Sequence, residues 1–109
     1  MLTPASKYNA KPTVVDGIRF MSKAEARRYG ELKLLERAGH ITELVLQPRY
    51  DLHVDGVKIG EYRGDFLYIS LPSYELITED VKGYDLPLGR WKRKHLKAEY
   101  GIDVVVVKA

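Results

Sequence analysis

The chain has 109 residues, of which 45% are hydrophobic and 30% charged, a composition that fits one globular domain and excludes a disordered chain. It contains no cysteine, which excludes disulfides and thiolate metal sites, so any metal would be held by oxygen ligands, a preference of Mg²⁺ and Mn²⁺ rather than Zn²⁺. No apolar run is long enough to cross a bilayer and no signal peptide opens the chain, so we expect a cytoplasmic protein that does not contact a membrane.

Charge is distributed unevenly along the chain. The formal net charge is only +3 at pH 7, but basic residues gather near the N-terminus and in residues 90–97, while acidic residues concentrate in the middle. Residues 1–12 carry Lys7 and Lys11 with little apolar content, and we expect them to form a flexible basic arm. The arm is either a frayed terminus or a strap for a phosphate backbone or a partner subunit, and residues 13–109 are expected to form a single domain.

A hairpin and a helix open the predicted domain. Residues 14–20 predict a short hairpin around an Asp-Gly turn. The sequence Ser-Lys-Ala-Glu at residues 22–25 matches the capping box, so a helix should begin after Ser22, run to about Ala38 and end at Gly39. Spacings of three residues predict its buried stripe, which comprises Tyr29, Leu32 and Leu35.

Glu25 has two alternative roles in this helix. It lies one turn before Tyr29, on the flank of the face that should point inward. As a capping residue it would be the reciprocal partner of Ser22 and would do nothing else. As a functional residue it would lean over the sheet as an additional acidic group. The residues alone leave both roles open.

Residues 46–53 predict an extended segment, and Pro48 places it at a sheet edge or a bulge. Within this segment, Gln47 would either orient a nucleophilic water as a supporting residue of a site or satisfy backbone groups as a buried amide. A second Asp-Gly turn follows within residues 53–57. We attribute its likeness to the first turn to shared turn chemistry rather than to an internal repeat.

Residues 64–83 contain two alternating apolar segments joined by a Pro-Ser corner, which predicts a strand, a turn and a second strand. Asp65 lies near the start of the first strand, and Asp80 and Lys82 lie at the end of the second. Side chains two residues apart share a face of a strand, and antiparallel pairing would bring Asp65 beside Asp80 and Lys82. Two carboxylates and an ammonium at one place predict a site for a divalent metal and an activated water.

A basic helix is predicted over residues 88–100. Its cations either form a solvated face or bind a nucleic-acid backbone with Trp91 as an anchor; they include Arg90, Lys92, Arg93 and Lys94. The continuous β-branched run at 102–107 predicts a strand that is buried on both faces and parallel to its neighbour. The order hairpin, helix, three mostly antiparallel strands, helix, strand predicts an α/β fold with a mixed central sheet.

This order, together with Asp65 and the motif Asp80-Val81-Lys82, resembles the core of the PD-(D/E)XK nuclease superfamily. Three segments, SKAEARRYGELKLLERAG, LQPRYDL and EDVKG, look more specifically like a small phage-encoded branch that is grouped with phage Holliday-junction resolvases and transposon-end endonucleases. The resemblance covers residues 7–107. It implies a three-layer, restriction-endonuclease-like core of order αβββαβ with an N-terminal β-hairpin.

Carried over position by position, the resemblance makes Asp65, Asp80 and the carbonyl of Val81 metal ligands. Lys82 would orient or help to deprotonate the attacking water and steady the developing charge. Glu25 matches the first-helix glutamate that completes the acidic cluster and contributes to the metal site in many members. The resemblance therefore moves our prediction for Glu25 from cap to site, and one residue can serve as both.

Two positions depart from the family pattern. Gly64 stands where the motif has proline, which affects only the local backbone. Asp80 occupies the second acidic position, where the motif also allows glutamate, and Glu79 is adjacent. A one-residue bulge would put Glu79 in the place of Asp80, but alternation with Lys82 favours Asp80 as the site residue.

The resemblance implies a Mg²⁺- or Mn²⁺-dependent endodeoxyribonuclease that hydrolyses phosphodiester bonds in phage DNA metabolism. Its substrate would be branched or replicating DNA in the cytoplasm of a phage-infected or prophage-bearing bacterium. We expect a homodimer, because one compact active site cannot cut two strands symmetrically, and we expect other phage replication or packaging proteins as further partners. The N-terminal arm and the first hairpin are our expected dimer contacts.

Two alternatives to a nuclease stay open. A nucleic-acid-binding module that kept the fold and lost catalysis would bind DNA in a salt-sensitive manner that does not depend on divalent metal. A structural or adaptor protein of the virion would bind neither metal nor DNA. The intact residue types of the predicted site argue against the binding module.

Overall fold

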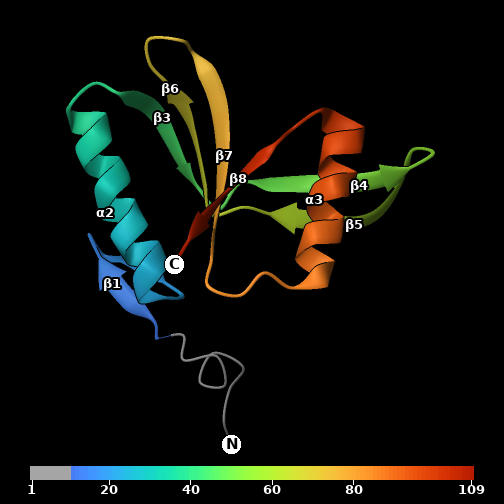
Figure 1. The fold of residues 1–109 in the computed structure, drawn as a ribbon, viewed down its shortest axis with the longest axis horizontal. Helices are drawn as coiled ribbons and strands as arrows, with labels where there is room; N and C mark the ends of the chain where they lie inside the picture. Colours follow the sequence, from blue (N-terminus) through green and yellow to red (C-terminus); the bar gives the residue numbers. More distant parts are fainter. Residues whose placement is uncertain (1–10) are drawn as a thin grey trace, which may run out of the picture.

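The computed structural model describes residues 11–109 as a mixed α/β fold (Figure 1). Within these residues two helices and eight strands follow in this order: β1 (Thr13–Val15), β2 (Ile18–Phe20), α2 (Lys23–Arg37), β3 (Ile41–Leu46), β4 (Arg49–Val54), β5 (Val57–Arg63), β6 (Phe66–Ser70), β7 (Glu75–Lys82), α3 (Pro87–Tyr100) and β8 (Val104–Lys108). Apart from the hairpins β1–β2 and β4–β5, the order is the predicted αβββαβ. Neither helix of this described part has the length and hydropathy needed to cross a membrane.

The central sheet has the strand order β3-β6-β7-β8. Strand β6 pairs antiparallel with both β3 and β7, whereas β8 pairs parallel with β7, so the sheet is mixed as predicted. The prediction that the last strand is buried on both faces is wrong, because Val105 and Val106 are 47% and 42% exposed. Strand β8 lies at the edge of the sheet, where no second neighbour covers it.

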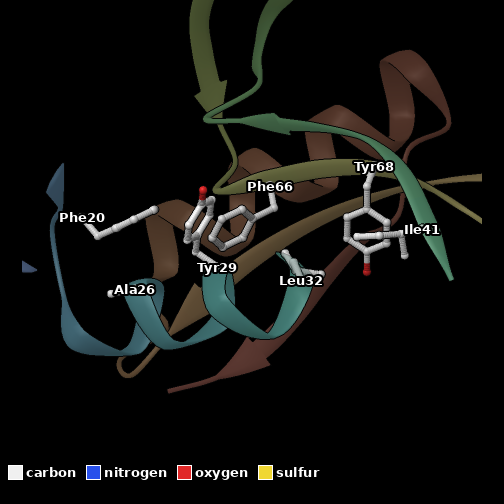
Figure 2. Close-up of a cluster of buried hydrophobic side chains, with 7 residues drawn as sticks. All are labelled: Phe20, Ala26, Tyr29, Leu32, Ile41, Phe66 and Tyr68. Carbon is white, nitrogen blue, oxygen red and sulfur yellow. The ribbon is translucent and has the colours of Figure 1, made fainter. Parts of the chain in front are cut away.

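Helix α2 covers one face of the sheet, and the β1–β2 hairpin packs beside it (Figure 1). Ser22 caps the helix as predicted, because its Oγ accepts a hydrogen bond of 3.1 Å from the amide of Glu25. Tyr29 and Leu32 of the predicted stripe are buried, and Leu35 packs at the margin. Figure 2 shows the core that forms between the hairpin, the helix and the sheet, which consists of Phe20, Ala26, Tyr29, Leu32, Ile41, Phe66 and Tyr68.

Helix α3 and the β4–β5 hairpin form the layer on the other side of the sheet (Figure 1). Leu52 of β4, Tyr62 of β5 and Leu96 of α3 make a second hydrophobic core. The predicted extended segment at 46–53 is therefore largely the first strand of a hairpin, which our sequence interpretation did not recognise. The hairpin turns at Asp55-Gly56, whose φ angles of 50° and 77° are those of a tight two-residue turn.

Candidate active site

Strand β7 separates its acidic residues onto two faces. Its pairing with β6 runs from Glu75 to Glu79 without a register shift, so side chains alternate regularly along it. Asp80 and Lys82 project together toward the layer of α3, and Glu79 projects toward α2. The bulge that would have put Glu79 in the place of Asp80 is absent from the described β6–β7 ladder.

Asp65 reaches the same place from the corner between β5 and β6. Its backbone is fixed on both sides, because its amide donates to the Glu79 carbonyl and its carbonyl accepts from the Gln47 amide, each at 2.9 Å. The amide of Val81 donates a hydrogen bond of 2.7 Å to Oδ2 of Asp65. This bond draws the Asp65 carboxyl group to the part of β7 that carries Asp80.

Gly64 makes this corner possible. Its amide donates a hydrogen bond of 2.9 Å to the Pro48 carbonyl, which a proline could not do. A Cβ atom at this position would lie 3.2 Å from Cγ2 of Thr78 and 3.4 Å from the Glu79 carbonyl oxygen. The position therefore needs a free amide, which proline lacks, and an added side chain would require a small local shift.

Asp80 is almost completely buried, with 2% of its surface exposed. Its Oδ2 accepts a hydrogen bond from the hydroxyl of Tyr62, a residue of the β4–β5 hairpin. Its Oδ1 lies 3.5 Å from the Lys82 ammonium, which is one-third exposed. The hairpin thus positions one oxygen of Asp80 while the other faces a cation at the surface, an arrangement that sequence reasoning missed because Tyr62 lies 18 residues away.

The three acidic residues of the predicted site interact with one another. Burial, a hydrogen bond with Asp80 and the charge of Glu25 raise the pKa of Asp65 to about 8. Burial, followed by the charge of Asp80, also raises the pKa of Glu25, although a hydrogen bond from the Met21 amide opposes this. The cluster therefore holds more negative charge than its cations balance, which favours uptake of a proton or a metal cation.

Glu25 does not form the reciprocal half of the capping box, because among the described residues its carboxylate accepts from the Met21 amide and not from the Ser22 amide. Its amide is capped by Ser22, while its carboxylate is turned toward the cluster, where it senses the charges of Asp80, Arg63 and Lys82. Arg63, at the end of β5, is a cation near the cluster that the sequence analysis did not single out. Its position depends on the hairpin, which periodicity alone did not predict.

Glu79 has different partners from the adjacent Asp80. Its carboxylate accepts two hydrogen bonds from the Arg28 guanidinium of α2, at 2.8 and 2.7 Å, and a third from the hydroxyl of Tyr68. It is 1% exposed, so this fully partnered charge lies in the interior between helix and sheet. The charged pattern of α2 favours a solvated position for Arg28, but its side chain is only 22% exposed because it is bound to Glu79.

A small cavity of about 150 Å³ lies next to Glu25 and Asp65 of the site. Its lining includes Glu25, Gln47 and Asp65. Gln47 is exposed, so the alternative of a buried amide is wrong, and its role toward a water stays a prediction. Arg19 of β2 lines the same cavity and adds a cation that sequence reasoning did not identify. Gln47 has a φ of 52°, and its backbone amide is used by Asp65.

The predicted nucleic-acid-binding residues fall into two groups. Lys92 donates to the Glu61 carbonyl at 2.9 Å, and Arg93 contacts both oxygens of Asp85 at 2.8 Å, so both are used within the fold. Arg90 and Lys94 are exposed on α3, although Arg90 also donates a hydrogen bond of 2.8 Å to the Asp85 carbonyl. Lys11 is exposed at the start of the described chain. Lys7 lies outside the described residues. Trp91 is 57% exposed, as a surface anchor requires.

Carboxylate oxygens are suitable ligands for a hard divalent cation, but the described residues do not form a complete coordination shell. Within residues 11–109, no group of three or more histidine, cysteine, aspartate or glutamate side chains is assembled to hold a metal ion. Asp65 and Asp80 form a hydrogen-bonded carboxyl pair, and Glu25 acts on the pair through its charge. Mg²⁺ is commonly held by one or two carboxylates with water and substrate phosphate completing its shell, so this pair fits the ion. The Val81 carbonyl stays a predicted ligand.

Fold and site together define a small mixed α/β domain with a buried acidic pair beside its central sheet. The family model described as "Protein of unknown function (DUF1064)" matches residues 5–108, and the chain belongs to this family. A search of curated proteins and a search of solved structures each returned no match.

Proposed function

We propose that this protein is a Mg²⁺-dependent endodeoxyribonuclease of the PD-(D/E)XK type. One observation carries the proposal: Asp65, Asp80, Lys82 and Glu25, from three separate segments, form one interacting cluster. Phosphodiester hydrolysis needs an activated water in line with the leaving oxygen and positive charge around the transition state. The cluster contains the ligand types and the ammonium group that this reaction requires.

Asp65 and Asp80 would hold the metal, assisted by the Val81 carbonyl, with Glu25 close by. When bound, Mg²⁺ lowers the pKa of a coordinated water and neutralises charge on the phosphate oxygens. The residues of the chain orient this chemistry: the Val81 amide fixes one oxygen of Asp65, and Tyr62 fixes one oxygen of Asp80. The remaining oxygen of Asp80 faces Lys82.

Lys82 would orient the attacking water and stabilise the negative charge that develops on the phosphate. Its side chain is 32% exposed, so it contacts Asp80 and solvent at the same time. Gln47 lines the adjoining small cavity and would hold a second water. Arg90, Lys94 and Lys11 supply exposed cations for the DNA backbone. A homodimer would place two such sites on the two strands of a branched or duplex substrate.

The first test is a cleavage assay on supercoiled plasmid and on a four-way junction, with Mg²⁺, Mn²⁺ or EDTA. Wild-type protein is compared with Asp80→Ala and Lys82→Ala, and Asp103→Ala is the control because Asp103 forms only a surface ion pair with Lys97. We expect cutting that requires the metal, is lost in both site variants and persists in the control.

An Asp80→Ala protein that cuts as fast as the wild type would refute the proposal. DNA binding that persists in EDTA, without cutting under either metal, would favour the binding module that kept the fold and lost catalysis. The preferred substrate in the positive case would show whether the enzyme acts on junctions or on continuous duplex.

A further inference from the structure

A second cavity adjoins the proposed catalytic cluster. It has a volume of about 610 Å³ and lies between the N-terminal turn of α2, the end of β7 and the loop that follows β7. Glu25 and Lys82 line it, so it opens directly onto the proposed site. A volume of this size falls in the range of cavities that take small organic ligands, such as one nucleotide.

The polar part of the lining is strongly cationic. Four cationic side chains, those of Lys11, Lys23, Arg27 and Lys82, surround the cavity, whereas Glu25 is its one acidic lining residue. Lys23 and Arg27 lie one helical turn apart on α2 and are both exposed. A concave surface lined by one sign of charge concentrates ions of the opposite sign, here a phosphate group.

The other lining residues include apolar and aromatic side chains. The loop after β7 contributes Tyr84 and Leu86, which are 71% and 48% exposed. Val81 of β7 and Ala24 of α2 add apolar surface. An aromatic ring next to a cationic surface is the combination on which unpaired bases stack while their phosphates are held by charge.

We propose that this cavity binds one unpaired nucleotide of the DNA substrate, with the base against Tyr84 and the phosphate among the lysines and Arg27. The inference rests on the proposed nuclease function and deepens it, because it names the substrate class as DNA with a single-stranded segment next to the cleaved bond. In continuous duplex each base is paired and stacked, so it must be extruded before it can enter such a cavity. Flaps, forks and gapped strands present the nucleotide without that cost.

Binding is measured separately from cutting by fluorescence anisotropy in EDTA at fixed salt. The probes are a labelled single-stranded oligonucleotide, a flap of the same sequence and the matching blunt duplex. Tyr84→Ala is paired with Tyr74→Ala, because Tyr74 is 75% exposed in the β6–β7 turn and is not among the cavity residues. Arg27→Ala is paired with Arg37→Ala on the last turn of the same helix.

We expect Tyr84→Ala to weaken binding of the single strand and the flap about tenfold and to leave duplex binding unchanged. Arg27→Ala should weaken binding of the single strand and of the flap. It should also make this binding less dependent on salt than it is in Arg37→Ala. Equal losses on duplex and single strand in Tyr84→Ala, or no loss on either, would overturn the proposal.

The same proteins are assayed for Mg²⁺-dependent cutting, so that the two proposals fail separately. Cutting that shows no preference for unpaired substrates and no dependence on Tyr84 would refute the nucleotide cavity and leave the nuclease standing. Tyr84-dependent single-strand binding without any cutting by the wild type would refute the nuclease and support the cavity as a binding site.

Discussion

Two neighbouring acidic residues, Glu79 and Asp80, lie on opposite faces of β7 and differ in how fully nearby cations balance their charge. On one face, the charge of Glu79 is matched by the Arg28 guanidinium at 2.7 Å and by a hydrogen bond from Tyr68. On the other face, Asp80 interacts with two further carboxyl groups, while Lys82 lies 3.5 Å away and is partly exposed. The two residues are equally buried, so they differ in charge balance rather than in burial.

This difference distinguishes a carboxylate that stabilises the fold from carboxylates that are available for chemistry. A buried charge with a complete set of partners stays ionised, and removal of its partner leaves an uncompensated charge in the interior. Carboxylates crowded beyond their cations gain stability when a proton or a metal ion binds. Substitutions on the two faces should therefore affect activity and stability in opposite ways.

The largest effect is expected from Asp80→Asn. Because a proposed metal ligand is lost and the shape is retained, cleavage should fall by at least about a thousandfold. The free energy of unfolding without metal should stay equal or rise, since one charge of a crowded cluster is removed. Plasmid cleavage and urea unfolding measure the two quantities. If Asp80→Asn lost activity only in proportion to a loss of stability, Asp80 and Glu79 would not differ in the way proposed for the two faces of β7.

Glu79→Gln should act mainly on stability. The substitution leaves the Arg28 guanidinium without its carboxylate, so the free energy of unfolding should fall by about 3 kcal/mol. The double variant Arg28→Met with Glu79→Leu removes both charges and should recover most of the loss, with cleavage retained. Urea titration of the three proteins measures this. A double variant less stable than Glu79→Gln would show that the pair itself, rather than the unpaired charge, determines stability.

The metal-free protein should lose stability as the pH rises. The pKa of Asp65 is raised to about 8 from an ordinary value of 3.8, so the folded state keeps a proton that the unfolded chain has released. Stability from this proton is complete below pH 4 and is lost as the pH rises toward 8. Urea unfolding in EDTA across this range measures the loss, and Asp65→Asn should reduce it.

Addition of Mg²⁺ should restore part of that stability at the alkaline end, because the cation replaces the proton in the acidic cluster. An Asp65→Asn profile parallel to that of the wild type would contradict the assignment of the proton to this group. A Mg²⁺ effect of equal size in Asp80→Asn would place the ion elsewhere.

The smallest effect is expected at the corner that brings Asp65 to β7. Gly64→Ala adds a Cβ atom 3.2 Å from Thr78 Cγ2, so the chain must shift slightly, at a cost of about 1 kcal/mol. Cleavage should fall severalfold because Asp65 moves with the corner. Gly60→Ala on β5 is the control, since nothing lies within 4 Å of its added Cβ. Equal stability and activity of the two variants would show that the corner tolerates displacement.

Local patterns predicted the elements that position the site. The Ser22 cap, the Asp16-Gly17 turn and the alternation of Asp80 with Lys82 depend on residues close in sequence, and each appears in the structure. Alternation also separated Asp80 from Glu79 correctly. Antiparallel pairing then brings Asp65 beside Asp80, as expected from two strands joined by a short turn.

Partners distant in sequence were not predictable in this way. Arg28 and Glu79 are 51 residues apart, so the spacing of α2, which places Arg28 one turn before the buried Leu32, could not identify its partner. The first strand and the Asp-Gly turn of the β4–β5 hairpin were predicted, but its second strand, Val57–Arg63, was not. The exposure of β8 depends on strand order, which composition does not encode.

The adjacency of Glu79 and Asp80 restricts how the length of β7 can change during evolution. Insertion or deletion of a single residue upstream within the strand would exchange the faces of both acids. Glu79 would then point toward Tyr62, and Asp80, one methylene shorter, would face Arg28 across a gap. Both acids would survive in the sequence while both of their functions were lost. Length variation among relatives should therefore be confined to the β6–β7 turn, and an alignment displaced by one position here would assign the wrong acid to the site.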